Sequence, residues 1–132
     1  MANLLTGLGG AAGFGEEFLT RNDDGSTDFI DLSSVFPNGM NFFGQVYTGL
    51  YVNNNGGLTF ASPRGTYTPT SIVSETNNPE IDAFYADVDT RLPSGGGDAL
   101  PNAVSPTPGG ASRGSDLLWY DLDTLNHTFT IT

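Results

Sequence analysis

The sequence predicts an all-β domain, an antiparallel β-sandwich of short strands joined by long Gly/Pro/Ser loops, with little helix. Short aromatic and β-branched runs alternate with turn residues, and the 132-residue chain holds 18 Gly and 8 Pro. No stretch shows apolar 3.6-residue periodicity over more than about two turns, which disfavours long helices. The length suits a single hydrophobic core and therefore one domain.

The expected strands are separated by clear turn signals. The strongest is "NNNGG" at residues 53–57, because Asn and Gly accept the positive φ angles of tight hairpin turns. The three asparagines of this stretch are accordingly assigned to turn geometry. A central strand is expected at "IDAFYADVD", and the last hairpin ends in "TFTIT". The predicted strands are residues 29–36, 42–52, 58–60, 81–89, 117–124 and 128–132.

The expected organisation is a Gly-rich flexible arm followed by one β domain. The arm covers residues 1–13 and the domain residues 14–132, with a long flexible loop over residues 92–116. The domain is expected to be incomplete at its C-terminus, because the sequence stops within the alternating strand pattern of "TFTIT". An open strand edge there predicts a protein partner or self-association by β-strand addition, with the arm as a candidate donor.

Charge excludes several classes of function. The chain contains fifteen acidic residues, four Arg and no Lys, so its formal net charge is −11. Such a chain is unsuited to nucleic acid, whose phosphates need clustered Lys and Arg. No run approaches the roughly 20 apolar residues of a membrane span, so membrane insertion is not expected. The acidic balance favours divalent cations and a location outside the cell or on its surface, where Ca²⁺ can replace the cross-links that a chain without Cys lacks.

Two expected strands repeat an aromatic-Asp-Asp pattern at alternate positions, which places each set on one strand face. If the strands pair, four carboxylates converge and could bind Ca²⁺, which takes six to eight oxygen ligands. The alternative is that one Asp of each set caps a turn or pairs with Arg91 while the other is solvated. A catalytic carboxylate pair is a third, weaker interpretation, and no catalytic residue is assigned. The two sets are Tyr85, Asp87 and Asp89, and Trp119, Asp121 and Asp123.

A second acidic segment, "TRNDDGSTDFID", invites comparison with a calcium-binding EF-hand loop. Thr20 stands at the first ligand position and Asp31 at the position of the bidentate Glu, so an EF-hand is rejected. A looser calcium-binding turn with Asp24, Asp28 and Asp31 remains one prediction for this segment. An Asx turn, in which Asn or Asp bonds the nearby backbone, is the other.

Three stretches together resemble the nidogen-like (NIDO) extracellular domain. They are "FFGQVYTGLYVNNNGGLTF", "PEIDAFYADVDTR" and "LLWYDLDTLNHTFTIT". The form is similar to those in large bacterial secreted proteins with calcium-rich repeats. The resemblance implies a β-rich, non-enzymatic module of extracellular matrix and adhesion proteins, possessing further strands after the segment seen here.

Three functions therefore remain open from the sequence. The first is an extracellular structural or adhesion module stabilised by calcium. The second is a subunit of a surface fibre or matrix, such as that of a biofilm, which assembles by strand complementation. The third is a carbohydrate-binding module that uses the Tyr85 and Trp119 faces.

Overall fold

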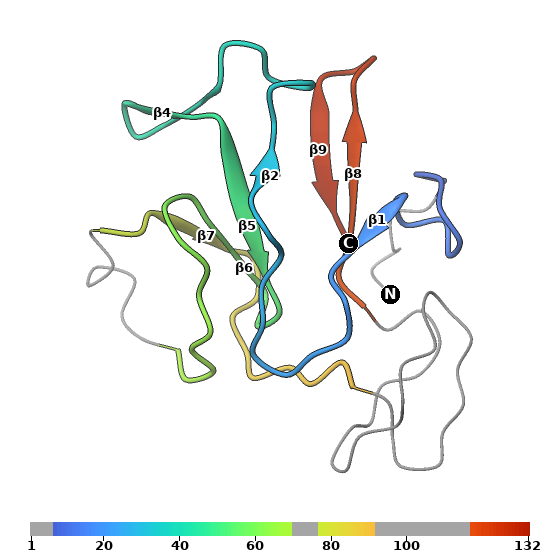
Figure 1. Ribbon diagram of the computed structural model, residues 1–132, viewed down its shortest axis with the longest axis vertical. Helices are drawn as coiled ribbons and strands as arrows, with labels where there is room; N and C mark the ends of the chain where they lie inside the picture. The colour runs from blue at the N-terminus through green and yellow to red at the C-terminus, as the bar shows by residue number, and fades with distance from the viewer. Residues whose placement is uncertain (1–6, 70–76, 92–116) are drawn as a thin grey trace.

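The computed structural model describes residues 7–69, 77–91 and 117–132, which contain nine strands and no helix (Figure 1). All strands pair in antiparallel fashion in three sheets, which confirms the predicted all-β, sandwich-like class. None of these residues forms a helix capable of crossing a membrane. The strands are β1 (Glu17–Phe18), β2 (Ile30–Asp31), β3 (Met40–Phe42), β4 (Gln45–Tyr47), β5 (Gly49–Asn53), β6 (Gly57–Thr59), β7 (Glu80–Asp82), β8 (Trp119–Asp123) and β9 (Thr128–Ile131).

A four-stranded sheet with the order β2-β5-β6-β7 forms one layer. Its register places Ile30 opposite Leu50, Val52 opposite Leu58, and Leu58 opposite Ile81. Since cross-strand partners share a face, these side chains form a continuous apolar surface. β5 has neighbours on both sides, and its Leu50 and Val52 are fully buried.

A three-stranded sheet with the order β1-β8-β9 forms the second layer. Alternate residues of β8 face in opposite directions, as the sequence pattern predicts. Tyr120 and Leu122 pair with Ile131 and Phe129 of β9 and pack toward the core. Trp119 points to the other side.

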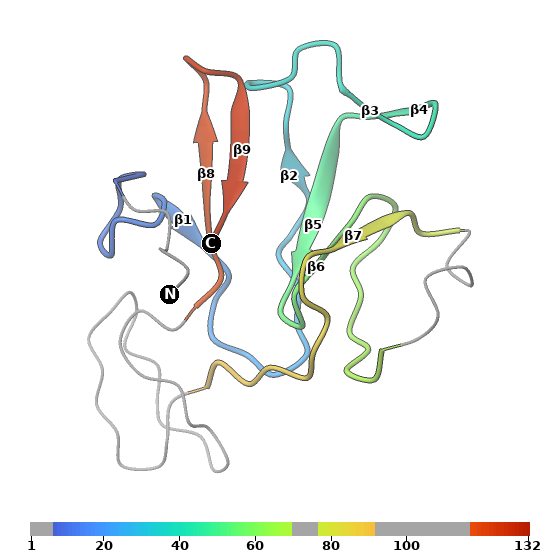
Figure 2. The same ribbon diagram turned by 180° about the vertical axis from the view of Figure 1, so that it is seen from behind.

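The apolar faces of the two sheets meet in one core. Figures 1 and 2 show β8 and β9 beside β2 and β5 in both views. Each buried aliphatic or aromatic side chain contributes about 1.5–3 kcal/mol, so this core holds the layers together. Its buried members are Ile30, Leu32, Val35, Leu50, Val52 and Phe60.

The prediction of one strand over residues 42–52 is wrong, because the chain reverses direction at Phe43 and Gly44. Their φ angles are 50° and 83°, and they form a two-residue turn between β3 and β4. The resulting hairpin projects from the sandwich in both views (Figures 1 and 2). The chain then enters β5, and the expected turn is present at residues 54–56.

Two other expected strands are much shorter than predicted. Residues 29–36 yield only β2, because the Asp31 carboxylate accepts a hydrogen bond from the Ser33 N–H at 2.8 Å and the chain turns. Residues 81–89 contribute only the end of β7. Beyond it, Ala86 and Val88 donate their N–H groups to the backbone and side-chain oxygens of Asn55. Loop acceptors therefore replace a strand partner along this segment.

The predicted N-terminal arm is only partly described. From residue 7 it forms a turn in which Gly7 N–H and Leu8 N–H donate to the Gly13 carbonyl at 2.8 and 3.1 Å. Residues 1–6 and the loop predicted over residues 92–116 lie outside the described residues. The flexibility of the arm and the completeness of the domain stay predictions.

Candidate functional site

The turn between β5 and β6 organises one end of the sandwich through buried asparagine side chains. Asn53 is fully buried, and its side-chain oxygen accepts hydrogen bonds from Ser26 Oγ at 2.7 Å and Arg64 N–H at 2.9 Å. Its amide nitrogen donates to the Gly57 carbonyl at 3.1 Å and to Thr59 Oγ1 at 3.2 Å. One side chain thereby joins two loops to the hairpin.

The next two asparagines attach two further segments. Asn54 donates to the carbonyls of Asp23 and Val88, and its side-chain oxygen accepts from Thr90 Oγ1 at 3.3 Å. Asn55 donates to Asp24 Oδ1 at 3.0 Å and accepts from the Val88 N–H at 2.8 Å. The prediction that these asparagines serve turn geometry was therefore incomplete. Three consecutive Asn exceed what a hairpin turn needs, and this excess was the signal in the sequence for a further role.

These attachments bring three carboxylates together at the surface. Oxygens of Asp23, Asp24 and Asp87 lie within 4.8 Å of one another, and they form the only such acidic group of three or more in the described ranges. Asp24 is oriented by Asn55. Asp23 was not singled out from the sequence, because nothing in the sequence shows that residues 22–25 lie against residues 85–90. We call Asp23, Asp24 and Asp87 the acidic cluster.

One positively charged side chain, that of Arg91, borders the acidic cluster. Arg91 pairs with Asp23 and with Asp89, each at 2.7 Å. Partial desolvation raises the pKa of Asp23 despite the opposing field of Arg91, and Asp89, Asp24 and Asp87 raise it further. The hydrogen bond from Arg91 lowers the pKa of Asp89. The cluster therefore holds more negative charge than its neighbouring guanidinium neutralises.

The predicted convergence of Asp87, Asp89, Asp121 and Asp123 is not what the structure shows. Asp87 lies with Asp23 and Asp24, and Asp89 meets Arg91, as the alternative interpretation predicted. Asp123 accepts hydrogen bonds from the N–H groups of Leu125 and Asn126, which caps the β8–β9 turn and lowers its pKa. The pairs separate because residues 85–89 are not a strand of the sheet that contains β8.

Asp121 lies in a different environment, on the outer face of β8. It is buried, and a hydrogen bond to the Glu16 side chain raises its pKa above the ordinary 3.8, with desolvation and repulsion from Glu16 and Asp123 adding to the rise. A raised native pKa means that the folded chain holds a proton where the unfolded chain has lost it. The stabilisation is complete below the unfolded pKa and is lost as the pH rises through the native value.

We therefore expect Asp121→Asn, which mimics the protonated acid, to flatten the pH dependence of stability. As the pH rises above the ordinary value of 3.8, the variant should lose less unfolding free energy than the parent chain. Denaturant titrations at several pH values measure this difference. Parallel curves for the two proteins would contradict the assignment.

Of the acidic turn predicted over residues 20–31, only Asp24 joins the acidic cluster. Asn22 Oδ1 accepts the Gly25 N–H at 2.5 Å, which is the Asx turn considered as the alternative. Asp31 instead accepts from Ser33, and this backbone bond lowers its pKa. Asp28 is exposed and lies outside the cluster.

A buried ion network lies next to the asparagine turn. The Arg64 guanidinium pairs with Glu80 and, at 2.7 Å, with Asp82, and all three side chains are buried. Burial raises the pKa of Glu80, while attraction to Arg64 opposes the rise. Arg64 also stacks on the Tyr85 ring at 4.0 Å from its centroid. No sequence pattern indicates this network, because the loop that carries Arg64 contacts β7 only in the folded chain.

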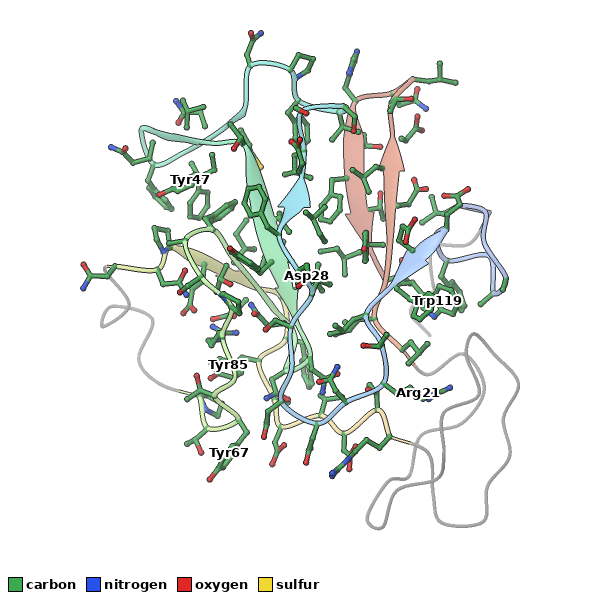
Figure 3. The ribbon with its side chains drawn as sticks, viewed as in Figure 1. Arg21, Asp28, Tyr47, Tyr67, Tyr85 and Trp119 are labelled. Atoms are coloured by element: carbon green, nitrogen blue, oxygen red, sulfur yellow. The ribbon has the colours of Figure 1, made fainter. Side chains whose placement is uncertain are left out.

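The aromatic faces proposed for carbohydrate binding are not available as a pair. Trp119 is 2% exposed and packs against Phe18 with ring centroids 5.6 Å apart. Tyr85 is occupied by Arg64, and Figure 3 shows it far from Trp119. A sugar cannot stack on both rings in this structure.

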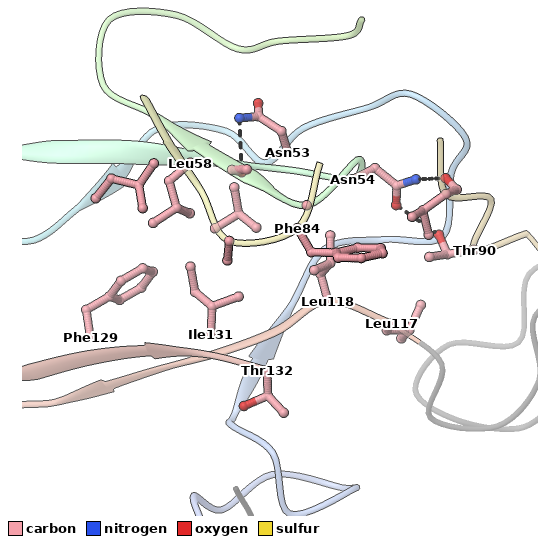
Figure 4. A pocket seen from close by; sticks show the side chains of 16 residues that line it. Asn53, Asn54, Leu58, Phe84, Thr90, Leu117, Leu118, Phe129, Ile131 and Thr132 are labelled. Atoms are coloured by element: carbon pink, nitrogen blue, oxygen red, sulfur yellow. Dashed lines mark hydrogen bonds between the residues drawn. The ribbon is translucent and has the colours of Figure 1, made fainter. Parts of the chain in front are cut away.

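An apolar cavity of about 580 Å³ opens between the two layers. Leu58 and Ile81 line it from the four-stranded sheet, and Phe129 and Ile131 line it from β9 (Figure 4). Phe84 borders it from the segment after β7. We call this cavity the interlayer groove. It marks where the three-stranded sheet leaves the face of β6 and β7 uncovered.

Comparison with known proteins adds a family assignment to this geometry. No solved structure matches the chain. A family model described as NIDO related matches residues 15–101, about two thirds of the chain. The matched span contains the asparagine turn, the acidic cluster and the buried ion network. The chain therefore belongs to the NIDO-related family, as its resemblance to the nidogen-like domain predicted.

Proposed function

We propose that this chain is a non-enzymatic extracellular structural or adhesion module whose loop end binds Ca²⁺ at the acidic cluster. The family assignment supports an extracellular type of module. The observation that carries the calcium proposal is the approach of Asp23, Asp24 and Asp87 to within 4.8 Å. Carboxylates are hard oxygen ligands of the kind that Ca²⁺ prefers, and Asp87 is exposed, so water can supply further ligands.

Two features support a role without catalysis. The single histidine, His127, has its Nδ1 at 3.0 Å from the Val35 carbonyl, where it connects the β8–β9 turn to the turn after β2. The buried carboxylates Glu80 and Asp82 are committed to Arg64. These groups hold loops in place, which suits a binding module better than an enzyme.

Millimolar Ca²⁺ should raise the melting temperature relative to chelator by about 3–8 °C, because a ligand that binds only the native state stabilises it by mass action. Asp87→Asn should abolish most of this shift. Asp28→Asn removes the same charge from an exposed site outside the acidic cluster and should keep the shift. Equal shifts in both variants would mean that calcium only screens the overall charge, and the calcium proposal would then fail.

A further inference from the structure

The β3–β4 hairpin exposes the aromatic side chain of Phe43, which we call the Phe43 knob. Phe43 is 93% exposed at the hairpin tip, and Val46 of β4 is also exposed. The φ of Phe43 is 50°, a left-handed conformation that Asn or Gly adopts more readily than a bulky residue. A strained and fully exposed phenylalanine is better explained by a contact it makes than by the turn it occupies.

The base of the hairpin is fixed on the sandwich. Phe42 and Tyr47 both pack on Phe60 of the core, with ring centroids 4.9 and 4.7 Å apart. Phe42 also meets the Phe43 ring edge-on at 4.7 Å. The hairpin that carries Phe43 is therefore anchored before it meets a partner, which lowers the entropy cost of binding.

Within residues 7–69, 77–91 and 117–132, the interlayer groove is an apolar surface that can receive such a knob. Its volume of about 580 Å³ accommodates an aromatic side chain, and Phe84 at its border is 73% exposed. Sixteen described residues line it, and none of them is charged (Figure 4). An aromatic ring inserted between Leu58 and Ile131 would cover surface that both layers leave open.

β9 adds a backbone edge along the same groove. Trp119 and Thr132 exchange both N–H···O bonds at 3.0 Å, so alternate residues of β9 point their backbone groups toward β8. The N–H and C=O groups of Phe129 and Ile131 consequently point away from β8, and no described strand pairs with that side. A short strand beside the groove can therefore bond to β9.

The distribution of charged side chains indicates that a second copy of this chain occupies the interlayer groove. The chain carries a formal net charge of −11, yet residues 40–47 contain no charged side chain and the groove lining contains none. Two copies can therefore join here without placing carboxylates face to face, whereas contacts through the acidic remainder are repulsive. We propose that the Phe43 knob of one copy inserts into the interlayer groove of a second copy, with its hairpin strand beside β9.

The contact is heterologous. The hairpin and β9 lie on opposite sides of β5 in both views, so a chain cannot fill its own groove (Figures 1 and 2). A knob on one side and a groove on the other generate head-to-tail rows of copies. This inference deepens the structural role proposed above by naming the partner, but it does not depend on calcium.

Sedimentation velocity of the full chain in chelator, from about 1 to about 200 µM, tests the contact in the range expected for small interfaces. The average mass should rise beyond that of a dimer. Phe43→Asn should weaken association more than about tenfold, because it removes the central aromatic contact. The same change should keep or raise the melting temperature, because Asn-Gly suits this turn.

The matched groove variant is Phe84→Glu, which places a charge at the groove border and should also abolish association. A mixture of the two variants has one intact knob and one intact groove, so it should form heterodimers and no larger species. A parent chain that stays monomeric, a Phe43→Asn chain that associates as well as the parent, or a mixture that stays monomeric would overturn the proposal. All measurements are made without calcium, so a failed calcium proposal leaves this test unaffected.

Discussion

Replacing Asn53 with alanine should lower the free energy of unfolding by about 3–5 kcal/mol, because buried partners lose their hydrogen bonds together. Asn53 is fully buried and joins Ser26, Arg64, Gly57 and Thr59. Truncation leaves the Arg64 N–H and the Gly57 carbonyl without this partner in a site closed to water. Chemical denaturation, followed by tryptophan fluorescence from Trp119, measures the loss.

Asn38→Ala is the matched control, since Asn38 is exposed in the turn before β3. Its effect should stay within about 0.5 kcal/mol, as for most surface substitutions. Comparable losses in the two variants would mean that the asparagine bonds add little beyond ordinary turn geometry. In that case the asparagine turn would not be what holds the loops of the acidic cluster.

Replacing Arg64 with methionine should cost about 3–5 kcal/mol, because it leaves two buried carboxylates without their counter-ion. Glu80 and Asp82 both pair with Arg64 and are buried with it. The loss should shrink on acidification, because burial raises the pKa of Glu80 and protonation then removes one unpaired charge. Unfolding free energies at neutral and mildly acidic pH measure both effects.

The control is a mutant cycle in which the Arg64 substitution is one change and the substitutions of Glu80 and Asp82 together are the other. On the Arg64→Met background, Glu80→Gln together with Asp82→Asn should recover most of the lost stability, because neutral amides are cheaper to bury than unpaired carboxylates. In the parent chain the same two changes should be destabilising, because they remove the partners of Arg64. Additive effects would show that the three charges do not interact in the native state.

The sequence predicted the elements whose causes are local. Alternating apolar residues in residues 117–132 produced the β8–β9 hairpin with its inward Leu122 and Phe129. The Asn-Gly chemistry of residues 53–57 produced the β5–β6 turn. Both depend on side-chain period and backbone φ preference within a few residues, so a single sequence contains the needed information. The fold class and the family resemblance follow from the same local patterns.

Two strand predictions failed because the pattern of alternating residues does not determine which contacts the segment makes. Tyr85, Asp87 and Asp89 have a correct strand pattern, yet the segment bonds to Asn55 rather than to a strand. Residues 42–52 read as one strand, although Phe43 adopts a left-handed conformation that its residue type disfavours. For residues 85–89 a long-range contact outweighs a local preference, and a period of two does not reveal which neighbour will be present.

The sequence by itself determined an all-β chain with strong turns and a high acidic charge. Only the tertiary structure decided which carboxylates meet. Asp87 joins Asp23 and Asp24 because Asn54 and Asn55 draw residues 22–25 and 85–90 onto one turn. Asp121 instead meets Glu16 because β1 pairs with β8. Carboxylates are placed by the backbone that carries them, and that backbone is positioned by buried hydrogen bonds between segments distant in the sequence.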